Sequence, residues 1–273
     1  MLEERSRPKP RRSHKPPFPR ILCAIDGTEA SLVAIDQALA VADGDAELRF
    51  VTAWSGKGSF EHAAVADERA RELAARAAER AREAGVTATV HHDSARPLGE
   101  AVLPELAWHD LVVVGAHPHG RATGIVFSEP ATQLVHRSPL PVLVARERPL
   151  AAGVVAATRA VPADRIALNA GAHLAARLGA ELTVVHVRER DDEERHAELQ
   201  AELANARALL GRRLDYVSED GSPARAIVAV AEGDGAGLVV VGSEGKQGLP
   251  ALRSVSERVA HQAPCSVLVM REG

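Results

Sequence analysis

The chain has 273 residues, of which 46% are hydrophobic, and a formal net charge of −4. That length and composition suffice for two domains of ordinary size, each with its own core. No apolar run approaches the ~20 residues that a membrane span requires, and the two cysteines, Cys23 and Cys265, are too few for a disulfide framework. These features argue against membrane-spanning and disulfide-rich classes, and we expect a cytoplasmic protein.

Residues 1–17 are expected to form a disordered basic tail. Within residues 1–20, seven Lys and Arg side chains stand against two Glu, a balance of +5, and five prolines accompany them. Such a segment has little apolar surface to bury. The remaining residues then carry −9, which opposes the binding of a polyanion. We therefore expect no nucleic acid among the partners.

The rest of the chain repeats one pattern twice. Residues 109–115 (HDLVVVG) return as 236–242 (AGLVVVG), and residues 138–144 (SPLPVLV) return as 263–269 (APCSVLV). Two further blocks recur in the same order, 46–51 as 180–185 and 96–97 as 222–223. A repeat of this length exceeds the ~50 residues of a solenoid unit. We therefore predict two copies of one domain, at residues 18–148 and 149–273.

Strands and helices alternate along the first copy. We expect strands at 21–25, 48–54, 86–91, 111–114 and 142–144, separated by helices that end at residue 39 or span 59–85, 97–108 and 130–137. Buried strands that alternate with helices predict a doubly wound parallel α/β sheet in each copy. Because the last strands, 142–144 and 267–269, are apolar edges, we expect them to lie against each other.

Two segments carry a family resemblance. Residues 21–31 (ILCAIDGTEAS) and 254–259 (SVSERV) resemble the universal stress protein family, and the resemblance covers nearly all of the chain after the tail. It implies two Rossmann-like domains, paired back to back through their last strands as an internal pseudo-dimer. It also implies that an Asp after the first strand holds a nucleoside, while a Gly-x2-Gly-x9-Gly-Ser/Thr loop after the fourth strand wraps the phosphates.

The first copy matches this nucleotide pattern only in part. Its residues at the family's binding positions are Asp26, Gly27, Thr28, Ala53, Gly115, Ser128 and Glu129. Pro118 stands in place of the second glycine, Ser128 in place of the third, and Glu129 in place of the hydroxyl residue. A proline removes a backbone donor and a carboxylate repels phosphate. ATP, the cofactor that the resemblance implies, is therefore expected to bind weakly or not at all.

The second copy departs further from the pattern. Its candidate cleft residues are Arg159, Gly242, Gly245, Arg253 and Ser254. Arg159 takes the place of Asp26, and only seven residues separate Gly245 from Arg253. If Arg159 and Arg253 converge, they would suit a phosphate or an acidic partner; the alternative is that both are surface arginines. Ser254 and Glu257 also form a capping box, which needs no ligand.

Residues outside the nucleotide pattern give weaker evidence for a functional site. The pairs His91-His92 and His117-x-His119 lack the spacing of a metal site. Trp54 either stacks on a base or packs at a cleft rim. Because no Ser/His/Asp, Cys/His or paired-carboxylate arrangement stands out, we expect no catalytic residue and no bound metal.

These observations favour a non-enzymatic stress-response or regulatory module with degraded adenine-nucleotide clefts that works through a protein partner not yet identified. One alternative is an ATP-binding stress sensor that uses the cleft of the first copy. A second alternative is a slow nucleotide hydrolase. A homodimer of the whole chain, and the role of the tail, are left open by the sequence.

Overall fold

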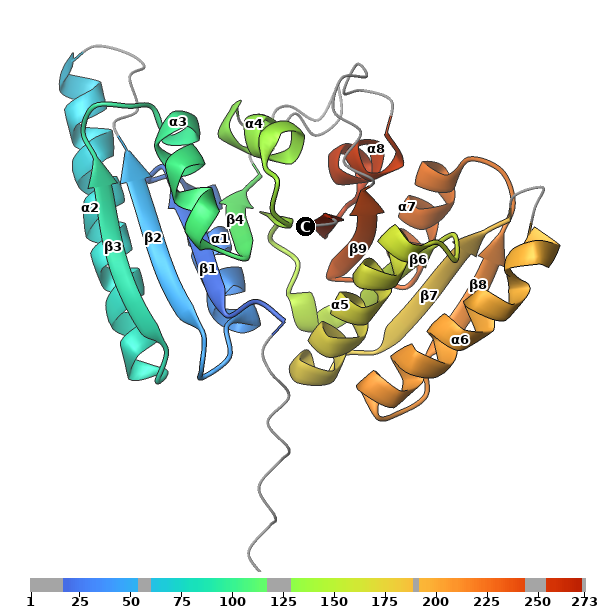
Figure 1. Cartoon of the computed structure of the whole chain (residues 1–273). Coiled ribbons are helices and arrows are strands. Elements are labelled where there is room, and N and C mark those ends of the chain that lie inside the picture. Colours follow the sequence, from blue (N-terminus) through green and yellow to red (C-terminus); the bar gives the residue numbers. More distant parts are fainter. Residues whose placement is uncertain (1–16, 54–59, 117–128, 189–191, 244–253, 272–273) are drawn as a thin grey trace, which may run out of the picture.

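The computed structural model describes residues 17–53, 60–116, 129–188, 192–243 and 254–271 (Figure 1). The strands are β1 Arg20–Ile25, β2 Glu47–Ala53, β3 Thr87–Asp93, β4 Leu111–Gly115, β5 Val142–Ala145, β6 Val154–Thr158, β7 Leu182–Val187, β8 Asp215–Glu219, β9 Leu238–Ser243 and β10 Ser266–Arg271. The helices are α1 Glu29–Val41, α2 Phe60–Glu83, α3 Leu98–Val102, α4 Glu129–Arg137, α5 Pro162–Leu178, α6 Asp192–Leu210, α7 Pro223–Gly233 and α8 Val255–Gln262, with short 3-10 helices η1 Leu103–Trp108 and η2 Leu150–Ala152.

All ten strands join one sheet in the order β3-β2-β1-β4-β5-β10-β9-β6-β7-β8. Within each half the five strands are parallel, and both halves arrange their strands in the same order. The order changes direction between the first and fourth strands of each half, which are β1 and β4 in the first and β6 and β9 in the second. The halves meet where β5 and β10 pair antiparallel, with Leu143 opposite Leu268. The expectation that the two last strands lie against each other is therefore confirmed, and so is the tandem doubly wound fold.

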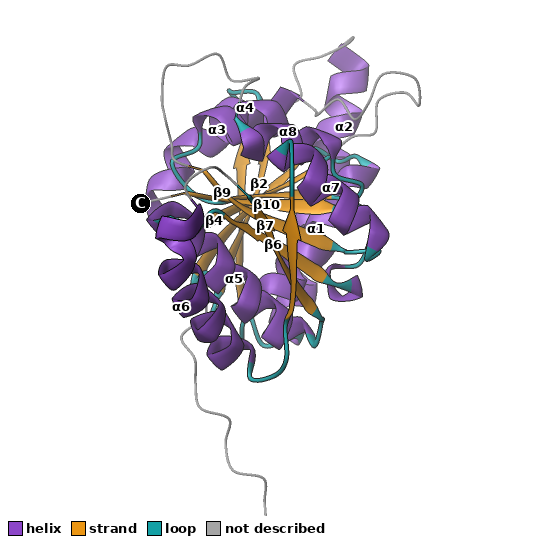
Figure 2. Ribbon diagram, turned by 90° about the vertical axis from the view of Figure 1, so that its right-hand side faces the viewer, coloured by secondary structure: helices purple, strands orange, loops and turns teal. Residues whose placement is uncertain are grey.

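Helices cover both faces of the sheet (Figure 2). This explains why the central strands are apolar along their whole length, since β4 and β5 are buried on both sides. One core layer lies under α1, α2, α5 and α6, and the other under α3, α4, α7 and α8. Both layers run without interruption through the β5–β10 junction, so the two halves share their cores.

A buried arginine also joins the halves. Arg146 follows β5, and its guanidinium donates hydrogen bonds to the main-chain oxygens of Cys265 (2.9 Å) and Ala260, both in the second half. Its backbone N–H donates to Ser266 Oγ at 2.9 Å. Burial lowers the pKa of the Arg146 guanidinium to about 10. The side chain thus remains a cation at neutral pH and ties the end of β5 to β10 and α8.

One expected helix has a different form. Residues 97–108 were expected to be a single helix, but the α-helix ends at Val102 and a 3-10 helix continues to Trp108. Pro104 explains the change, because it has no N–H to donate to the carbonyl four residues earlier. The equivalent helix of the second half, α7, has no internal proline and stays α-helical over Pro223–Gly233.

Deletion of residues 1–17 is expected to leave the melting temperature unchanged within about 1 °C, because a basic, proline-rich segment offers little apolar surface. Thermal unfolding of the full and shortened chains would measure this. Phe18, only 3% exposed, supplies the control, since Phe18→Ala should cost about 3 kcal/mol. A loss of several degrees on deletion would contradict the prediction.

Candidate ligand clefts at the carboxyl ends of the strands

Asp26 lies at the carboxyl end of β1, where ligands bind in sheets of this kind. Its Oδ1 accepts hydrogen bonds from the Thr28 backbone N–H (3.1 Å), the Thr28 hydroxyl (2.6 Å) and the Ser31 hydroxyl (2.7 Å). Ser31 Oγ in turn accepts from the Asp26 N–H at 2.9 Å. This ring fixes the carboxylate at the start of α1. Sequence reasoning found Asp26 and Thr28 but missed Ser31.

Gly27 is required by the fold itself. Its φ is +79°, and a Cβ there would lie 3.1 Å from the main-chain oxygen of Ala66 and 3.2 Å from the nitrogen of Ala70, both on α2. Only glycine adopts this backbone without strain while α2 packs so close. The glycine therefore has a structural explanation that needs no nucleotide.

Gly115, at the end of β4, is explained in the same way. A Cβ on Gly115 would lie 2.3 Å from the main-chain oxygen of Ala30 in the first turn of α1. Ala53, the remaining described candidate of the first cleft, ends the neighbouring strand β2 and is buried. Ser128 lies outside the described residues, and so does the side chain of Glu129. The structure therefore brings together Asp26, Gly27, Thr28 and Ala53, which belong to the nucleoside half of the candidate site, and Gly115, the first glycine position of the phosphate loop.

In the second half, Arg159 occupies the position of Asp26, directly after β6. Its backbone N–H donates to Asp164 Oδ2 at 2.8 Å, and its Nε donates to the same oxygen at 2.9 Å. The Asp164 side chain is only 5% exposed. The same bond connects Asp26 to Ser31 in the first half, from the strand end to the first helical turn. In the second half a base replaces the acid at the strand end, and an acid replaces the hydroxyl on the helix. The second cleft thus presents a guanidinium held by its own carboxylate.

Glu202 adds a further internal contact that sequence reasoning missed. It lies on α6, where Leu199, Leu203 and Ala206 form the buried face, yet it is itself 3% exposed. Its Oε2 accepts from the Thr158 hydroxyl at 2.9 Å, and its Oε1 lies 3.7 Å from Arg165 Nε. Burial raises the pKa of Glu202. The sequence feature that could have revealed Glu202 is a carboxylate at a position on the apolar face of a helix.

Ser254 caps α8 as expected, because its Oγ accepts from the Glu257 N–H at 3.1 Å. The reciprocal half of the capping box does not form. Glu257 Oε1 instead lies 2.8 Å from His136 Nδ1 on α4, across the junction between the halves. This correction has a physical reason, since the partnered imidazole lies within reach only after β5 and β10 have paired.

The remaining candidates are placed as follows. Gly242 lies in β9, opposite Met270, whereas Gly245 and Arg253 lie outside the described residues, as do Trp54, Pro118, His117 and His119. His92 Nδ1 lies 2.9 Å from Thr52 Oγ1, and its Nε2 lies 2.9 Å from an Arg71 nitrogen. Within the described ranges, no group of three His, Cys, Asp or Glu side chains could hold a metal ion.

Gly27 and Ala160 allow a matched test of backbone strain, because each is the second residue after its half's first strand. Ala160 has a φ of +57°, a conformation that favours glycine. We expect Gly27→Ala to cost about 2 kcal/mol, while Ala160→Gly should be neutral or stabilise by up to about 1 kcal/mol. Urea unfolding would measure the free energy of unfolding of both variants. The prediction would be contradicted if both substitutions destabilised the protein to the same extent.

Comparisons with known proteins agree with this architecture. The model of a family described as the Universal stress protein family matches residues 17–146 and again residues 154–271. A universal stress protein structure from Archaeoglobus fulgidus DSM 4304 has a TM-score of 0.74 at 20% identity, covering 95% of this chain and 100% of that one. A putative universal stress protein from Pseudomonas aeruginosa UCBPP-PA14 has a TM-score of 0.71 at 19% identity, covering 93% of each chain. No curated protein matches the chain. Within the described residues, no helix is long and apolar enough to cross a membrane.

Proposed function

Because the chain belongs to the universal stress protein family, with two copies of the domain in tandem, we propose that it is a non-enzymatic stress-response module whose two clefts differ. The first half keeps the nucleoside side of an adenine-nucleotide cleft, and the second half no longer admits a nucleotide. The chain then acts through a protein partner and not through catalysis. The observation that carries the proposal is the Arg159–Asp164 pair.

A nucleoside in the second cleft would compete with that pair. Moving the Arg159 guanidinium away would leave Asp164 as an unpaired carboxylate that is only 5% exposed. Because the Arg159 side chain is 34% exposed, solvent screens part of this interaction. Leaving the Asp164 carboxylate without the guanidinium should still cost about 1–3 kcal/mol, which is a large part of the binding free energy of a millimolar ligand, about 4 kcal/mol. The buried Glu202–Thr158 contact restrains the same strand end. These contacts support a second cleft that is closed by its own side chains.

The first cleft supports the alternative of a nucleotide sensor. Three donors hold the Asp26 carboxylate in place, so its orientation needs no further ordering when a ligand arrives. The substitutions at Pro118, Ser128 and Glu129 oppose phosphate binding in the same cleft. We therefore favour a cleft that contacts a nucleoside but holds phosphates weakly.

Wild-type protein is expected to bind ATP with a Kd weaker than about 1 mM, and Pro118→Gly, Ser128→Gly and Glu129→Ser together should raise its affinity at least about tenfold. The triple substitution restores backbone donors and removes a carboxylate, both of which favour an anion. Titration calorimetry would measure the affinities. Adding Asp26→Ala to the triple variant is the control and should abolish the gain.

Two outcomes would overturn the proposal. One is micromolar ATP binding by the wild type, and the other is a stoichiometric adenine nucleotide released when freshly purified protein is denatured. Phosphate release from ATP tests the remaining alternative, a slow hydrolase. We expect the wild type and the Asp26→Ala variant to give equal background rates.

A further inference from the structure

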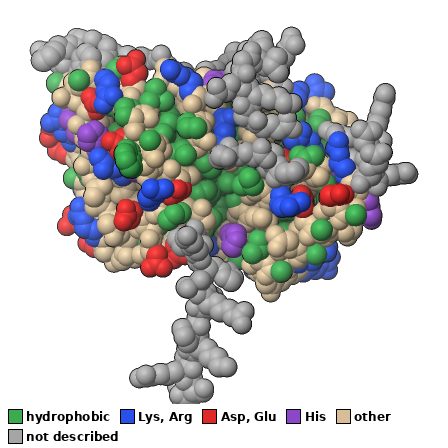
Figure 3. Space-filling model, viewed as in Figure 1, with side chains coloured by type: hydrophobic (Ala, Val, Ile, Leu, Met, Phe, Trp, Pro, Cys, Tyr) green, Lys and Arg blue, Asp and Glu red, His purple; other side chains and the backbone are tan. Residues whose placement is uncertain are grey.

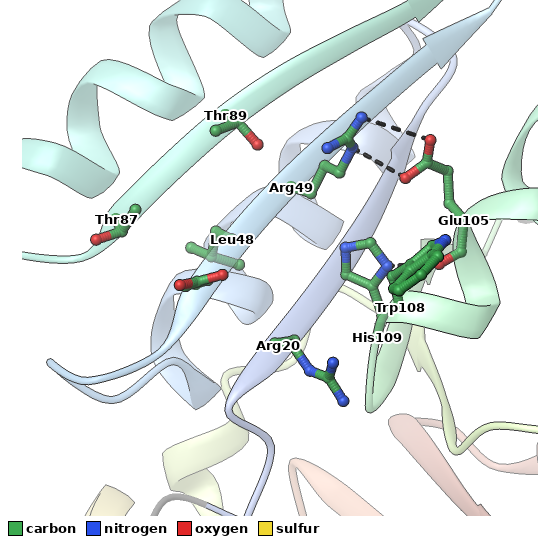
Figure 4. A pocket seen from close by; sticks show the side chains of 9 residues that line it. Arg20, Leu48, Arg49, Thr87, Thr89, Glu105, Trp108 and His109 are labelled. Atoms are coloured by element: carbon green, nitrogen blue, oxygen red, sulfur yellow. Dashed lines mark hydrogen bonds and ion pairs between the residues drawn. The ribbon is translucent and has the colours of Figure 1, made fainter.

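A groove of about 400 Å³ opens at the end of the sheet opposite to the first cleft. It lies where β1, β2 and β3 begin, and its far wall is the end of η1 (Figure 4). Glu47 and Arg49 face Thr87 and Thr89 on the neighbouring edge strand, in the registers Glu47–Thr87 and Arg49–Thr89. The alternate residues, such as Leu48, point to the opposite face and join the core. Glu47, Arg49, Thr87 and Thr89 therefore give this part of the sheet face a largely polar surface.

Trp108 stands at the rim of this groove and is 69% exposed. It is placed there by η1, the 3-10 helix that Pro104 imposes, and it does not contribute to the core. The second half keeps α7 as a regular helix and has Gly235 at the corresponding repeat position. The fold can thus be built without an aromatic residue at this point. An exposed indole ring offers a broad apolar face that a ligand can cover.

The two arginines around Trp108 are each paired with a carboxylate. Arg49 Nε lies 3.0 Å from Glu105 Oε2, and Arg20 donates to both carboxylate oxygens of Asp110 at 3.0 and 2.9 Å. Arg20 lowers the pKa of Asp110, so that pair is ionised at neutral pH. The space-filling view likewise shows basic and acidic side chains interspersed on this half, without a large patch of one sign (Figure 3). Glu47 also lines the groove and adds a further carboxylate. A phosphate would therefore meet arginines that are already paired, together with an additional negative charge.

The same groups still offer directional hydrogen bonds. Planar guanidinium and carboxylate groups retain further donors and acceptors after pairing, and Thr87 and Thr89 each supply a hydroxyl that can do both. His109 Nδ1 lies 2.6 Å from the main-chain oxygen of Glu105 and so carries the proton. Nε2 is then the ring nitrogen that a ligand in the groove can meet. The groove combines one apolar platform with mixed donors and acceptors and little net charge.

We propose that this groove binds a neutral saccharide, with the apolar face of one sugar ring stacked on Trp108 and its hydroxyls bonded to Thr87, Thr89 and the Arg49–Glu105 pair. A sugar ring has a flat C–H face and a rim of hydroxyls that donate and accept, which is the complement of this surface. A nucleotide could also stack on the indole, but its phosphates would find no unpaired cation among the groove residues. The site is separate from the nucleotide clefts and does not depend on them.

Fluorescence offers a direct test, because the chain has only two tryptophans, Trp54 and Trp108. In a Trp54→Phe background, a panel of neutral disaccharides, including maltose, cellobiose and lactose, would be titrated against Trp108 emission. We expect a saturable change for at least one of them with a Kd of about 1 mM or below. Glucose 6-phosphate and AMP are the anionic comparisons and should bind at least about tenfold more weakly.

Variants that preserve the fold connect binding to the groove. Because Trp108→Ala removes the fluorophore, saccharide binding by the variants would be measured by titration calorimetry. Trp108→Ala should abolish binding. Thr87→Val combined with Thr89→Val should weaken the affinity about tenfold, because the sugar hydroxyls lose their hydrogen-bond partners. Tyr216→Ala, which removes an exposed aromatic on the opposite edge strand, is the matched control and should bind as the parent does. The proposal is overturned if no neutral saccharide gives a saturable change, if Trp108→Ala binds unchanged, or if only AMP or a peptide of residues 1–17 binds.

Discussion

Gly115→Ala is expected to destabilise the protein by at least about 3 kcal/mol in the absence of any ligand. The new methyl carbon would lie 2.3 Å from the main-chain oxygen of Ala30 and 2.5 Å from its carbonyl carbon. Neither atom can rotate away, so the start of α1 or the end of β4 must move. Overpacking of a rigid site commonly costs about 1–3 kcal/mol, and a backbone overlap of this size belongs at the upper end.

Chemical unfolding in urea, with the midpoint and slope both measured, would test this. Gly44→Ala is the matched control, because a Cβ at Gly44 meets no heavy atom within 4 Å, and it should change stability by less than about 0.5 kcal/mol. A Gly115→Ala variant as stable as the parent would show that Gly115 is not needed for packing. Its role would then have to come from a bound ligand.

Arg146→Ala is expected to cost about 3 kcal/mol of unfolding free energy. The change removes the donor from the main-chain oxygens of Cys265 and Ala260, and each buried acceptor left without a partner costs about 1–3 kcal/mol. Some of this is returned, because burying the guanidinium is itself unfavourable, as its lowered pKa of about 10 indicates. The net effect should still be a large loss, because the cavity left by the side chain adds to it.

Arg148→Ala provides the comparison. Arg148 also donates to a main-chain oxygen, that of Ala236 at 3.0 Å, but it is only partly buried, so water can replace it. We expect a cost below about 1 kcal/mol, measured by the same urea titration. Equal effects of the two variants would contradict the view that Arg146 holds the halves together.

The sequence predicts the fold well because the repeat and the apolar strands are local features. The blocks 109–115 and 236–242 lead directly to two equivalent halves, and the apolar edges 142–144 and 267–269 lead to their pairing, which β5 and β10 confirm. What could not be predicted depends on contacts between distant residues. Glu202 meets Thr158 only after α6 packs on α5, and Glu257 meets His136 only across the junction.

The candidate site, like the fold, could be predicted only where it depends on local sequence. Asp26 and Arg159 were found because each directly follows a recognisable strand. Asp164 was missed although it is only five residues from Arg159, because its effect depends on the helix turning its carboxylate back to the strand end. Trp108 was not singled out either. Its exposure follows from the 3-10 geometry after Pro104, which a periodic helix pattern does not reveal.

The antiparallel β5–β10 pair has a consequence for how this protein can diverge. Two identical subunits joined in this way would share every substitution, so a change that closed one cleft would close the other. Here both partners belong to one chain, and each strand end is encoded separately. The interface stays intact because it uses main-chain pairing, apolar side chains and the buried Arg146, while the surroundings of the two clefts are free to differ. Covalent linkage thus lets one half serve as a permanent scaffold for the other, at any concentration of the protein.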